Sequence, residues 1–333
     1  MARIRELDAI RGLAIIIVVL FHSSLTNYNP DLFYCLVTFA LASFIFVSGF
    51  LSYSGLKNTK RFISDRVKSI YIPFLVFLIA IYFFNLQVYN LTDPTAYIYH
   101  ASFLSVFQSS QSYPGGIYNL SAFWFIPCLL VYFLLFALVR NDKAKIVLSI
   151  MLFTANFISW THSLDLIFEW RFTEFLVIFT LGYFIAKYQV LTRKYFYLAS
   201  LFMSLIATLC VLLPIEQFNG LSIDRFIYVT VWETVFTIAS VLTIIVYLSY
   251  IRFKGLELLG RMTLYIYLLE PFIRYFVESY TSNLALELAV NFTVILFGAY
   301  TLTNIKALQR RIASTHQIIK TENPEFKNKM KIV

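Results

Sequence analysis

The chain has 333 residues, of which 59% are hydrophobic and 14% are charged, and its mean hydropathy is +0.74. Because a soluble domain has roughly a quarter of its residues charged, this composition excludes an ordinary soluble globular protein and predicts a polytopic membrane protein. The net charge of +9 does not indicate a nucleic-acid partner, because the basic residues lie in short connections between apolar runs. The three cysteines lie within apolar runs without metal-ligand spacing, so we expect neither a disulfide framework nor a metal site.

The first predicted helix covers Arg3–Thr26, with charged residues at its start and His22 inside its apolar part. Arg11 and His22 are eleven positions apart, which at about 100° per residue places both side chains on one face, about 16 Å apart along the axis. Asp8 precedes Arg11 by three positions and shares that side. An ionisable group deep in an apolar helix is costly and is a functional candidate, although a lone histidine is more often a buried side chain satisfied by a neighbour.

Ten apolar stretches are long enough to cross a membrane, and all are expected to be helices because an open strand edge cannot be satisfied in lipid. They are 9–26, 33–54, 70–90, 120–139, 144–160, 172–187, 195–213, 227–250, 262–280 and 284–305. The predicted fold is therefore an all-α polytopic membrane protein with about ten transmembrane helices. We expect a membrane-embedded domain over residues 1–305 and a basic, mobile cytoplasmic tail over residues 306–333.

The connections between these stretches differ sharply in charge. Of the 27 Lys and Arg residues, 24 lie on one side of the predicted membrane and three on the other. This positive-inside bias predicts that both termini are cytoplasmic. The longest connection, residues 91–119, contains no Lys or Arg and is predicted to lie outside. A long outer connection is either a disordered connector or a lid over a site, and the sequence favours neither.

The segment LDAIRGLAIIIVVLFH, which ends at His22, resembles the first helix of acyltransferase family 3, whose hallmark is an Arg or Lys, ten residues and a His. Other segments are similar to motifs of the same family. They are FIFVSGFLSYS with Ser48, RFISDRVKSIYIPF with Arg66, SAFWFIPCLLVYFLL with Trp124, FTLGYFIAK, and LLGRMTLYIYLLEPFI. The last departs from the family pattern, because Glu270 stands where a histidine is usual.

The resemblance implies a multi-pass enzyme of the cell (plasma or inner) membrane that moves an acyl group, usually acetyl, from cytoplasmic acyl-CoA to a hydroxyl of a carbohydrate or glycolipid. His22 would act as the catalytic base or accept the acyl group itself. Arg11 would belong both to the catalytic pair and to the acyl-CoA site, where Arg66 would also bind phosphate. Positive-inside topology alone is the alternative for Arg66. Ser48 is expected either at the donor site or in plain helix packing.

On the outer side, Trp124, Glu174 and Glu233 are candidate contacts to a carbohydrate or lipid-linked glycan acceptor. An interfacial tryptophan belt and structural hydrogen bonds or ion pairs are the alternatives. Glu270 and Arg274 are four positions apart and are predicted to form a structural ion pair. Besides acyl-CoA and the acceptor, the expected partners are membrane lipids and another protein of glycan synthesis.

A transporter or flippase of a lipid-linked sugar or polysaccharide is the alternative function. It would share the many helices, the buried charges and the tryptophans of the outer side. Against it, the sequence contains no repeated half and no pair of broken helices in corresponding positions. Hydrolysis or exchange of labelled acetyl-CoA by the purified protein distinguishes the two functions.

Overall fold

The computed structural model describes residues 4–89, 93–106, 121–161, 170–190, 237–248, 253–278 and 283–322, with the single positions 202, 205 and 251. These residues form helices and turns and contain no strand, which confirms the predicted all-α class. The chain divides into two compact units, Met1–Arg261 and Met262–Val333.

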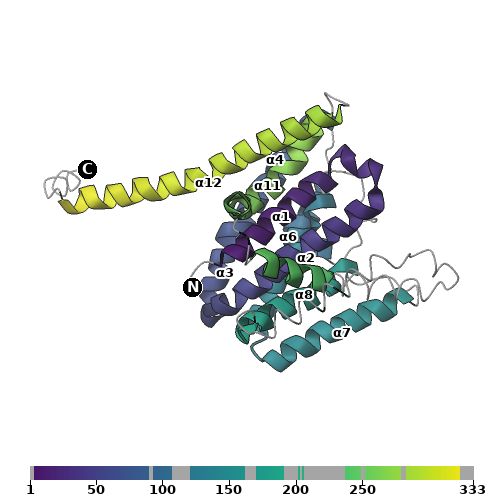
Figure 1. The fold of residues 1–333 in the computed structure, drawn as a ribbon. Helices are drawn as coiled ribbons and strands as arrows, with labels where there is room; N and C mark the ends of the chain where they lie inside the picture. Colours follow the sequence, from purple (N-terminus) through teal and green to yellow (C-terminus); the bar gives the residue numbers. More distant parts are fainter. Residues whose placement is uncertain are drawn as a thin grey trace. The chain divides into compact units, whose positions relative to one another are not determined.

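Most of the α-helices in the described residues overlap predicted apolar stretches, and two short ones lie in predicted connections (Figure 1). The helices are α1 (Arg5–Phe21), α2 (Pro30–Gly55), α3 (Thr59–Arg66), α4 (Ile72–Tyr89), α5 (Thr95–Ala101), α6 (Phe125–Leu138), α7 (Asp142–Thr161), α8 (Trp170–Lys187), α11 (Lys254–Glu278) and α12 (Leu284–Glu322). Another apolar helix covers Thr237–Leu248. The predicted stretch 195–213 lies almost entirely outside the described residues, and 227–250 lies partly outside them.

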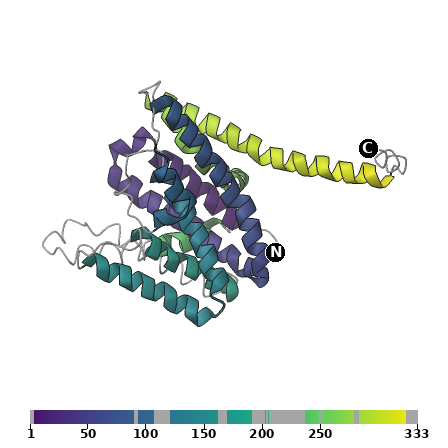
Figure 2. The same ribbon diagram turned by 180° about the vertical axis from the view of Figure 1, so that it is seen from behind.

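Two helical runs of the described residues are long and apolar enough to cross a membrane, Leu36–Gln87 and Leu284–Asn304. The first is the succession of α2, α3 and α4, in which the basic helix α3 separates two apolar helices. Seen from behind, α3 and α4 continue into each other as one helical run (Figure 2). The number of spans and their orientation remain predictions.

Within the first unit, α1, α2, α8 and α7 lie side by side in that order (Figure 1). The contact between α2 and α8 is a close backbone approach at two glycines. A Cβ at Gly49 would overlap the carbonyl oxygen of Phe179, and a Cβ at Gly182 would overlap the carbonyl oxygen of Phe46. Small residues permit such close helix packing, which is common in membrane proteins. The glycines of the two family-like motifs on α2 and α8 therefore join these helices.

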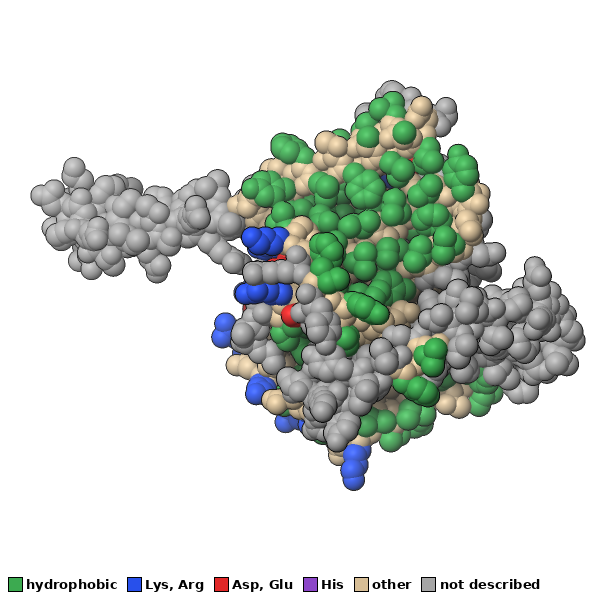
Figure 3. All heavy atoms as spheres, in the orientation of Figure 1, with side chains coloured by type: hydrophobic (Ala, Val, Ile, Leu, Met, Phe, Trp, Pro, Cys, Tyr) green, Lys and Arg blue, Asp and Glu red, His purple; other side chains and the backbone are tan. Residues whose placement is uncertain are grey.

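Apolar side chains of α4 and α7 are exposed on the surface of the first unit. Those of α4 recur every three or four residues and are 48% to 58% exposed: Ile72, Val76, Ile79 and Phe83. Those of α7 are Ile146, Val147, Ile150, Met151 and Ile158. Hydrophobic side chains also cover much of the face drawn in Figure 3. Contiguous apolar surfaces of this kind mark contact with a membrane or a protein partner.

The described part of the connection after α4 runs back along that helix. Asn85, near the end of α4, donates a hydrogen bond of 2.6 Å to the Tyr97 hydroxyl. The Tyr71 hydroxyl, at the start of α4, donates one of 2.9 Å to the Ala101 carbonyl. Because these two anchors lie about 20 Å apart along the helix, this segment packs along α4, and its side of the membrane stays a prediction. Phe103 turns the chain with a left-handed φ of 64°.

The second unit contains the rest of α11 and α12. The predicted ion pair is confirmed, since Arg274 Nε lies 3.1 Å from Glu270 Oε1. The tail predicted after residue 305 is helical as far as Glu322, because α12 continues to that residue. The extension is rich in helix-forming Ala, Leu, Gln, Lys and Arg and has no Gly or Pro before Pro324. Residues 323–333 lie outside the described residues.

Candidate active site

The helix α1 carries the predicted pair Arg11 and His22, and one side of it is buried. The buried side chains recur at helical spacing: Leu7, Ile10, Ala14, Ile15, Val18 and Val19. This side packs against α2 within the first unit. The helix is unbroken from Arg5 to Phe21, so the axial separation of about 16 Å between Arg11 and His22 applies.

Two close contacts fix the first turns of α1 against the start of α11. A Cβ at Gly12 would overlap the carbonyl oxygen of Leu256, and a Cβ at Gly260 would overlap that of Asp8. Next to this contact, Arg11 Nη1 lies 4.0 Å from Asp8 Oδ1, as their spacing predicted. The backbone that carries the guanidinium of Arg11 is therefore held in place by a neighbouring helix.

The other end of α1 differs from the prediction, because the helix ends at Phe21 and not at Thr26. His22 is the C-cap residue, and its N–H donates to the Val18 carbonyl at 3.2 Å. The Ser23 hydroxyl donates to the Leu20 carbonyl at 2.6 Å, and the Thr26 hydroxyl donates to the Phe21 carbonyl. These hydroxyls satisfy carbonyls that a helix end would leave unpaired in an apolar environment.

His22 is half-buried at this capped end. Its ring centroid lies 5.4 Å from that of Phe21, with the planes tilted by 56°. The backbone of His22 thus has a fixed position, directly after the apolar run of α1. An imidazole held at the end of a helix in this way can act as a general base or as a nucleophile.

Arg66 ends α3, and its guanidinium lies against two phenylalanine rings that also contact each other. The guanidinium carbon is 5.0 Å from the Phe62 ring centroid and 4.9 Å from the Phe133 ring centroid. The Arg66 Nε is buried and donates no hydrogen bond to the described residues. The adjacent carboxylate, Asp65, lies 3.8 Å from Arg61. The contacts of Arg66 with described residues are therefore aromatic.

Arg11 and Arg66 interact electrostatically although they lie far apart in the sequence. Arg66 is in the basic connection between two predicted spans. Burial lowers the pKa of its guanidinium, and the positive charge of Arg11 lowers it further, while Asp65 opposes both effects. An anion placed at these arginines would relieve their repulsion and accept charge-assisted hydrogen bonds.

Ser48 occupies a different position from the two arginines. It is half-buried on α2, and its carbonyl accepts a hydrogen bond of 2.6 Å from the Ser52 hydroxyl. None of the described contacts joins its side chain to Arg11 or Arg66. The packing of Gly49 against α8 explains the Ser-Gly-Phe motif without a ligand.

Two of the candidate acceptor residues, Trp124 and Glu174, are described in the first unit. Trp124 ends a short 3-10 helix (Ser121–Trp124), and its ring stacks on Phe175 at a centroid distance of 6.0 Å and an angle of 14°. Glu174 precedes Phe175 in α8 and is buried. The structure thus brings Trp124 to the part of α8 that carries Glu174. Glu233 lies outside the described residues.

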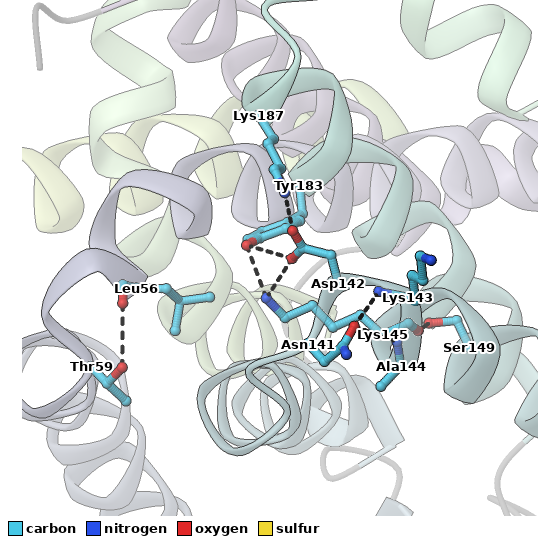
Figure 4. A network of polar contacts seen from close by, with 10 residues as sticks. All are labelled: Leu56, Thr59, Asn141, Asp142, Lys143, Ala144, Lys145, Ser149, Tyr183 and Lys187. Atoms are coloured by element: carbon cyan, nitrogen blue, oxygen red, sulfur yellow. Dashed lines mark hydrogen bonds and ion pairs between the residues drawn. The ribbon is translucent and has the colours of Figure 1, made fainter.

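A polar cluster that the sequence did not predict joins α7 to α8 (Figure 4). The Lys145 side chain is only 5% exposed, and its Nζ lies 3.2 Å from Asp142 Oδ1 and 2.9 Å from the Tyr183 hydroxyl. Lys187 also pairs with Asp142, and the Tyr183 hydroxyl donates to the same carboxylate at 3.3 Å. The i,i+3 spacing of Asp142 and Lys145 was a usable signal. The α8 partners lie too far along the chain to leave one.

The surroundings of Asp142 favour the ionised form of its carboxylate. Burial raises the pKa of Asp142, but the hydrogen bonds from Lys187 and Lys145 together outweigh it, so the pKa lies below its usual value of 3.8. The carboxylate therefore stays ionised between its two lysines. A second bond, of 2.7 Å, joins the Ser149 and Thr180 hydroxyls of the same two helices.

Exposed apolar side chains on α4 and α7 suit a membrane environment. Charged residues of α1 and α3 form an ionisable site. Together they define a helical membrane-type protein with such a site. The chain belongs to the acyltransferase 3 family, because the model of the family's Acyltransferase domain matches residues 4–305. The protein is therefore an acyltransferase, of a family whose members are generally membrane proteins. No curated protein and no solved structure matches the chain.

Proposed function

We propose that the protein is an integral membrane acyltransferase that moves an acyl group, in the first instance acetyl, from cytoplasmic acyl-CoA to a hydroxyl of a carbohydrate or glycolipid. The observation that carries the proposal is the unbroken helix α1, which holds Arg11 near one end and leads to His22 at the other. The electrostatic interaction of Arg66 with Arg11 supports it. The multi-pass topology, with both termini in the cytoplasm of a cell (plasma or inner) membrane, follows from the positive-inside bias.

The donor would bind by its phosphates at the two arginines. Coenzyme A carries several phosphate groups, and a guanidinium matches phosphate with two parallel N–H donors. The distance of about 16 Å along α1 suits an extended pantetheine arm that runs from Arg11 to His22. The thioester would then lie beside the imidazole.

His22 would act on the acceptor hydroxyl or on the thioester. In the first route, the hydroxyl oxygen attacks the thioester carbonyl carbon while the imidazole accepts the hydroxyl proton. The carbon–sulfur bond breaks, and the proton passes to the leaving CoA thiolate. In the second route, an imidazole nitrogen attacks the acyl carbon, the carbon–sulfur bond breaks and CoA leaves as the thiolate. The acceptor hydroxyl then attacks the acyl-imidazole, the carbon–nitrogen bond breaks, and the hydroxyl proton passes to the CoA thiolate. Arg11 would assist either route by fixing the donor.

The acceptor would contact Trp124, Glu174 and Glu233. An indole ring stacks on a sugar face, and a carboxylate accepts hydrogen bonds from sugar hydroxyls. Surface polysaccharide or lipid-linked glycan suits these groups. Another protein of glycan synthesis would supply or consume the acceptor.

Radiolabelled acetyl-CoA tests the proposal directly. The purified protein in lipid nanodiscs should release labelled acetate slowly or transfer label to an added glycan fraction, and the His22→Gln variant should do neither. If a folded wild-type preparation gives no hydrolysis, exchange or transfer with any glycan fraction, the acyltransferase proposal for this donor is wrong. Uptake of lipid-linked sugar into vesicles by such a preparation would support the transporter instead.

A further inference from the structure

We infer that Phe62 and Phe133 are positioning residues of the donor site, which hold the Arg66 guanidinium ready for an anionic group of the acyl donor. This inference rests on the proposed function, because it assigns Arg66 to the donor. The rings lie on different elements, α3 and α6, so the tertiary fold of the first unit builds the arrangement.

The two rings hold fixed positions against the guanidinium. Their centroids are 5.5 Å apart and their planes are almost perpendicular, at 87°. Phe62 is 5% exposed and Phe133 is 1% exposed. Phe133 also packs edge-on against Phe179 at 5.8 Å. Neither ring has room to move away from Arg66 without disturbing its neighbours.

A largely buried guanidinium usually has a carboxylate partner, because an uncompensated buried charge is costly. Here Asp65 pairs with Arg61, and the ring faces of Phe62 and Phe133 stabilise the cation. A ring face attracts the positive charge without accepting the N–H groups in ordinary hydrogen bonds. The donors of Arg66 therefore remain available to a phosphate in a two-point, bidentate contact.

The positive charge of Arg11 acts on the Arg66 guanidinium. Cations repel, and a flexible side chain would turn away towards water. The ring contacts hold Arg66 in one place in the absence of ligand. An anion then meets two charges already in place, so its binding does not have to order the side chain.

Gly55 provides an independent way to move Phe62. A Cβ at Gly55 would overlap Cδ2 of the Phe62 ring. The Gly55→Ala variant therefore displaces the ring while every charged residue stays unchanged. It should raise the KM for acetyl-CoA in the same direction as a substitution of the ring itself.

Initial-rate kinetics of the full-length protein in nanodiscs test the inference. Loss of one cation–π contact in Phe133→Leu should raise the KM for acetyl-CoA by roughly 3- to 10-fold, with kcat nearly unchanged. Phe133→Tyr keeps an aromatic face and should retain the wild-type KM. The matched control is Phe74→Leu, since Phe74 is fully buried and packs on the Phe123 ring without a cation nearby. With acetyl-pantetheine, which lacks the nucleotide phosphates, Phe133→Leu and wild type should have equal KM values.

The outcomes separate this inference from the proposed function. If Arg66→Ala raises the KM for acetyl-CoA but Phe133→Leu behaves like Phe74→Leu, the positioning role is wrong and the donor site stands. If Arg66→Ala leaves the KM unchanged, the donor site itself is wrong. Should Phe133→Leu elute as aggregate, Phe62→Leu and Gly55→Ala decide, and wild-type KM values in both overturn the inference.

Discussion

The Tyr71 hydroxyl donates a hydrogen bond of 2.9 Å to the carbonyl of Ala101, 30 positions further along the chain. The bond ties the connection after α4 back to the start of that helix. The ring centroid of Tyr82, in α4, lies 5.1 Å from that of Tyr97, in the connection, and this contact supports the same arrangement. A segment with no Lys or Arg is thereby packed on an apolar helix, where its buried Tyr97 hydroxyl accepts a hydrogen bond from Asn85.

This packing predicts a pattern of cysteine labelling in a variant without native cysteines. Ser64→Cys, which is exposed on α3, should react with a membrane-impermeant reagent only from the cytoplasmic side. Ser112→Cys should react only from the outside. Ser105→Cys should react from neither side before denaturation, because Ser105 is 1% exposed. Reaction of positions 64 and 112 from one side would contradict the topology.

The proposed role of His22 predicts that His22→Gln abolishes nearly all transfer. Glutamine retains hydrogen bonding but cannot shuttle a proton, and loss of a general base costs about 10²–10⁴ in rate. His316→Gln is the control, because position 316 lies beyond the region that matches the family. Both variants should elute as folded protein with similar melting temperatures. Wild-type turnover of His22→Gln would remove the catalytic assignment.

The donor site predicts different kinetic effects for two arginines of α3. Arg66→Ala should raise the KM for acetyl-CoA more than it lowers kcat, because it removes a phosphate contact made in ground and transition states alike. Arg61→Ala should have little effect, since Arg61 is 81% exposed and pairs with Asp65 on the surface. Equal KM values for the two variants would leave positive-inside topology as the explanation of Arg66.

Arg11 should behave differently from His22 when its charge is kept. Arg11→Lys retains a positive charge at the same height on α1 but loses the planar fork. It should therefore keep part of the activity, with a raised KM for acetyl-CoA, whereas Arg11→Ala should lose more. Identical activities of the two variants, measured in the same assay, would show that charge at position 11 is not used.

The Asp142 cluster predicts a pH-dependent stability. Asp142→Asn removes the charge that Lys145 and Lys187 share, and should lower the free energy of unfolding by about 1 kcal/mol after solvent screening is allowed for. Because the folded-state pKa of Asp142 is lowered, this stability is present above the unfolded pKa of about 3.9 and is lost as the pH falls through the folded value.

Thermal unfolding of the purified protein tests the direction in which this stability changes with pH. The difference in Tm between wild type and Asp142→Asn should be constant from pH 6 to 8 and should narrow below about pH 4. Asp65→Asn is the control, because the Asp65 side chain is 67% exposed in its ion pair. A difference in Tm that grows on acidification would contradict the assignment.

The sequence predicted those parts of the fold that depend on local composition. The bounds of α2, α4, α7 and α8 follow from apolar runs between charged connections, and the pair of Glu270 and Arg274 follows from helical spacing. The end of α1 was placed too late, because side-chain hydroxyls of Ser23 and Thr26 cap carbonyls within an apolar sequence. Such capping is not visible in hydropathy.

The contacts between distant segments needed the structure. Arg66 could be assigned to phosphate from its motif, but its place beside Phe133 depends on how α3 packs on α6. Lys187 and Asp142 are 45 positions apart, so no local pattern joins them. The packing of residues 95–106 along α4 depends likewise on aromatic contacts between segments, which an absence of charge does not reveal.

Because α12 continues to Glu322, the distance of this residue from the apolar stretch of the helix can be measured. Eighteen residues follow the apolar stretch that ends at Asn304, and as a helix they extend about 27 Å. A fluorescent protein joined after residue 322 would be held at this distance from the last apolar turn by the helix, whereas an unstructured linker would allow a range of distances. Energy transfer from that reporter to a dye in the bilayer would show a single, long separation.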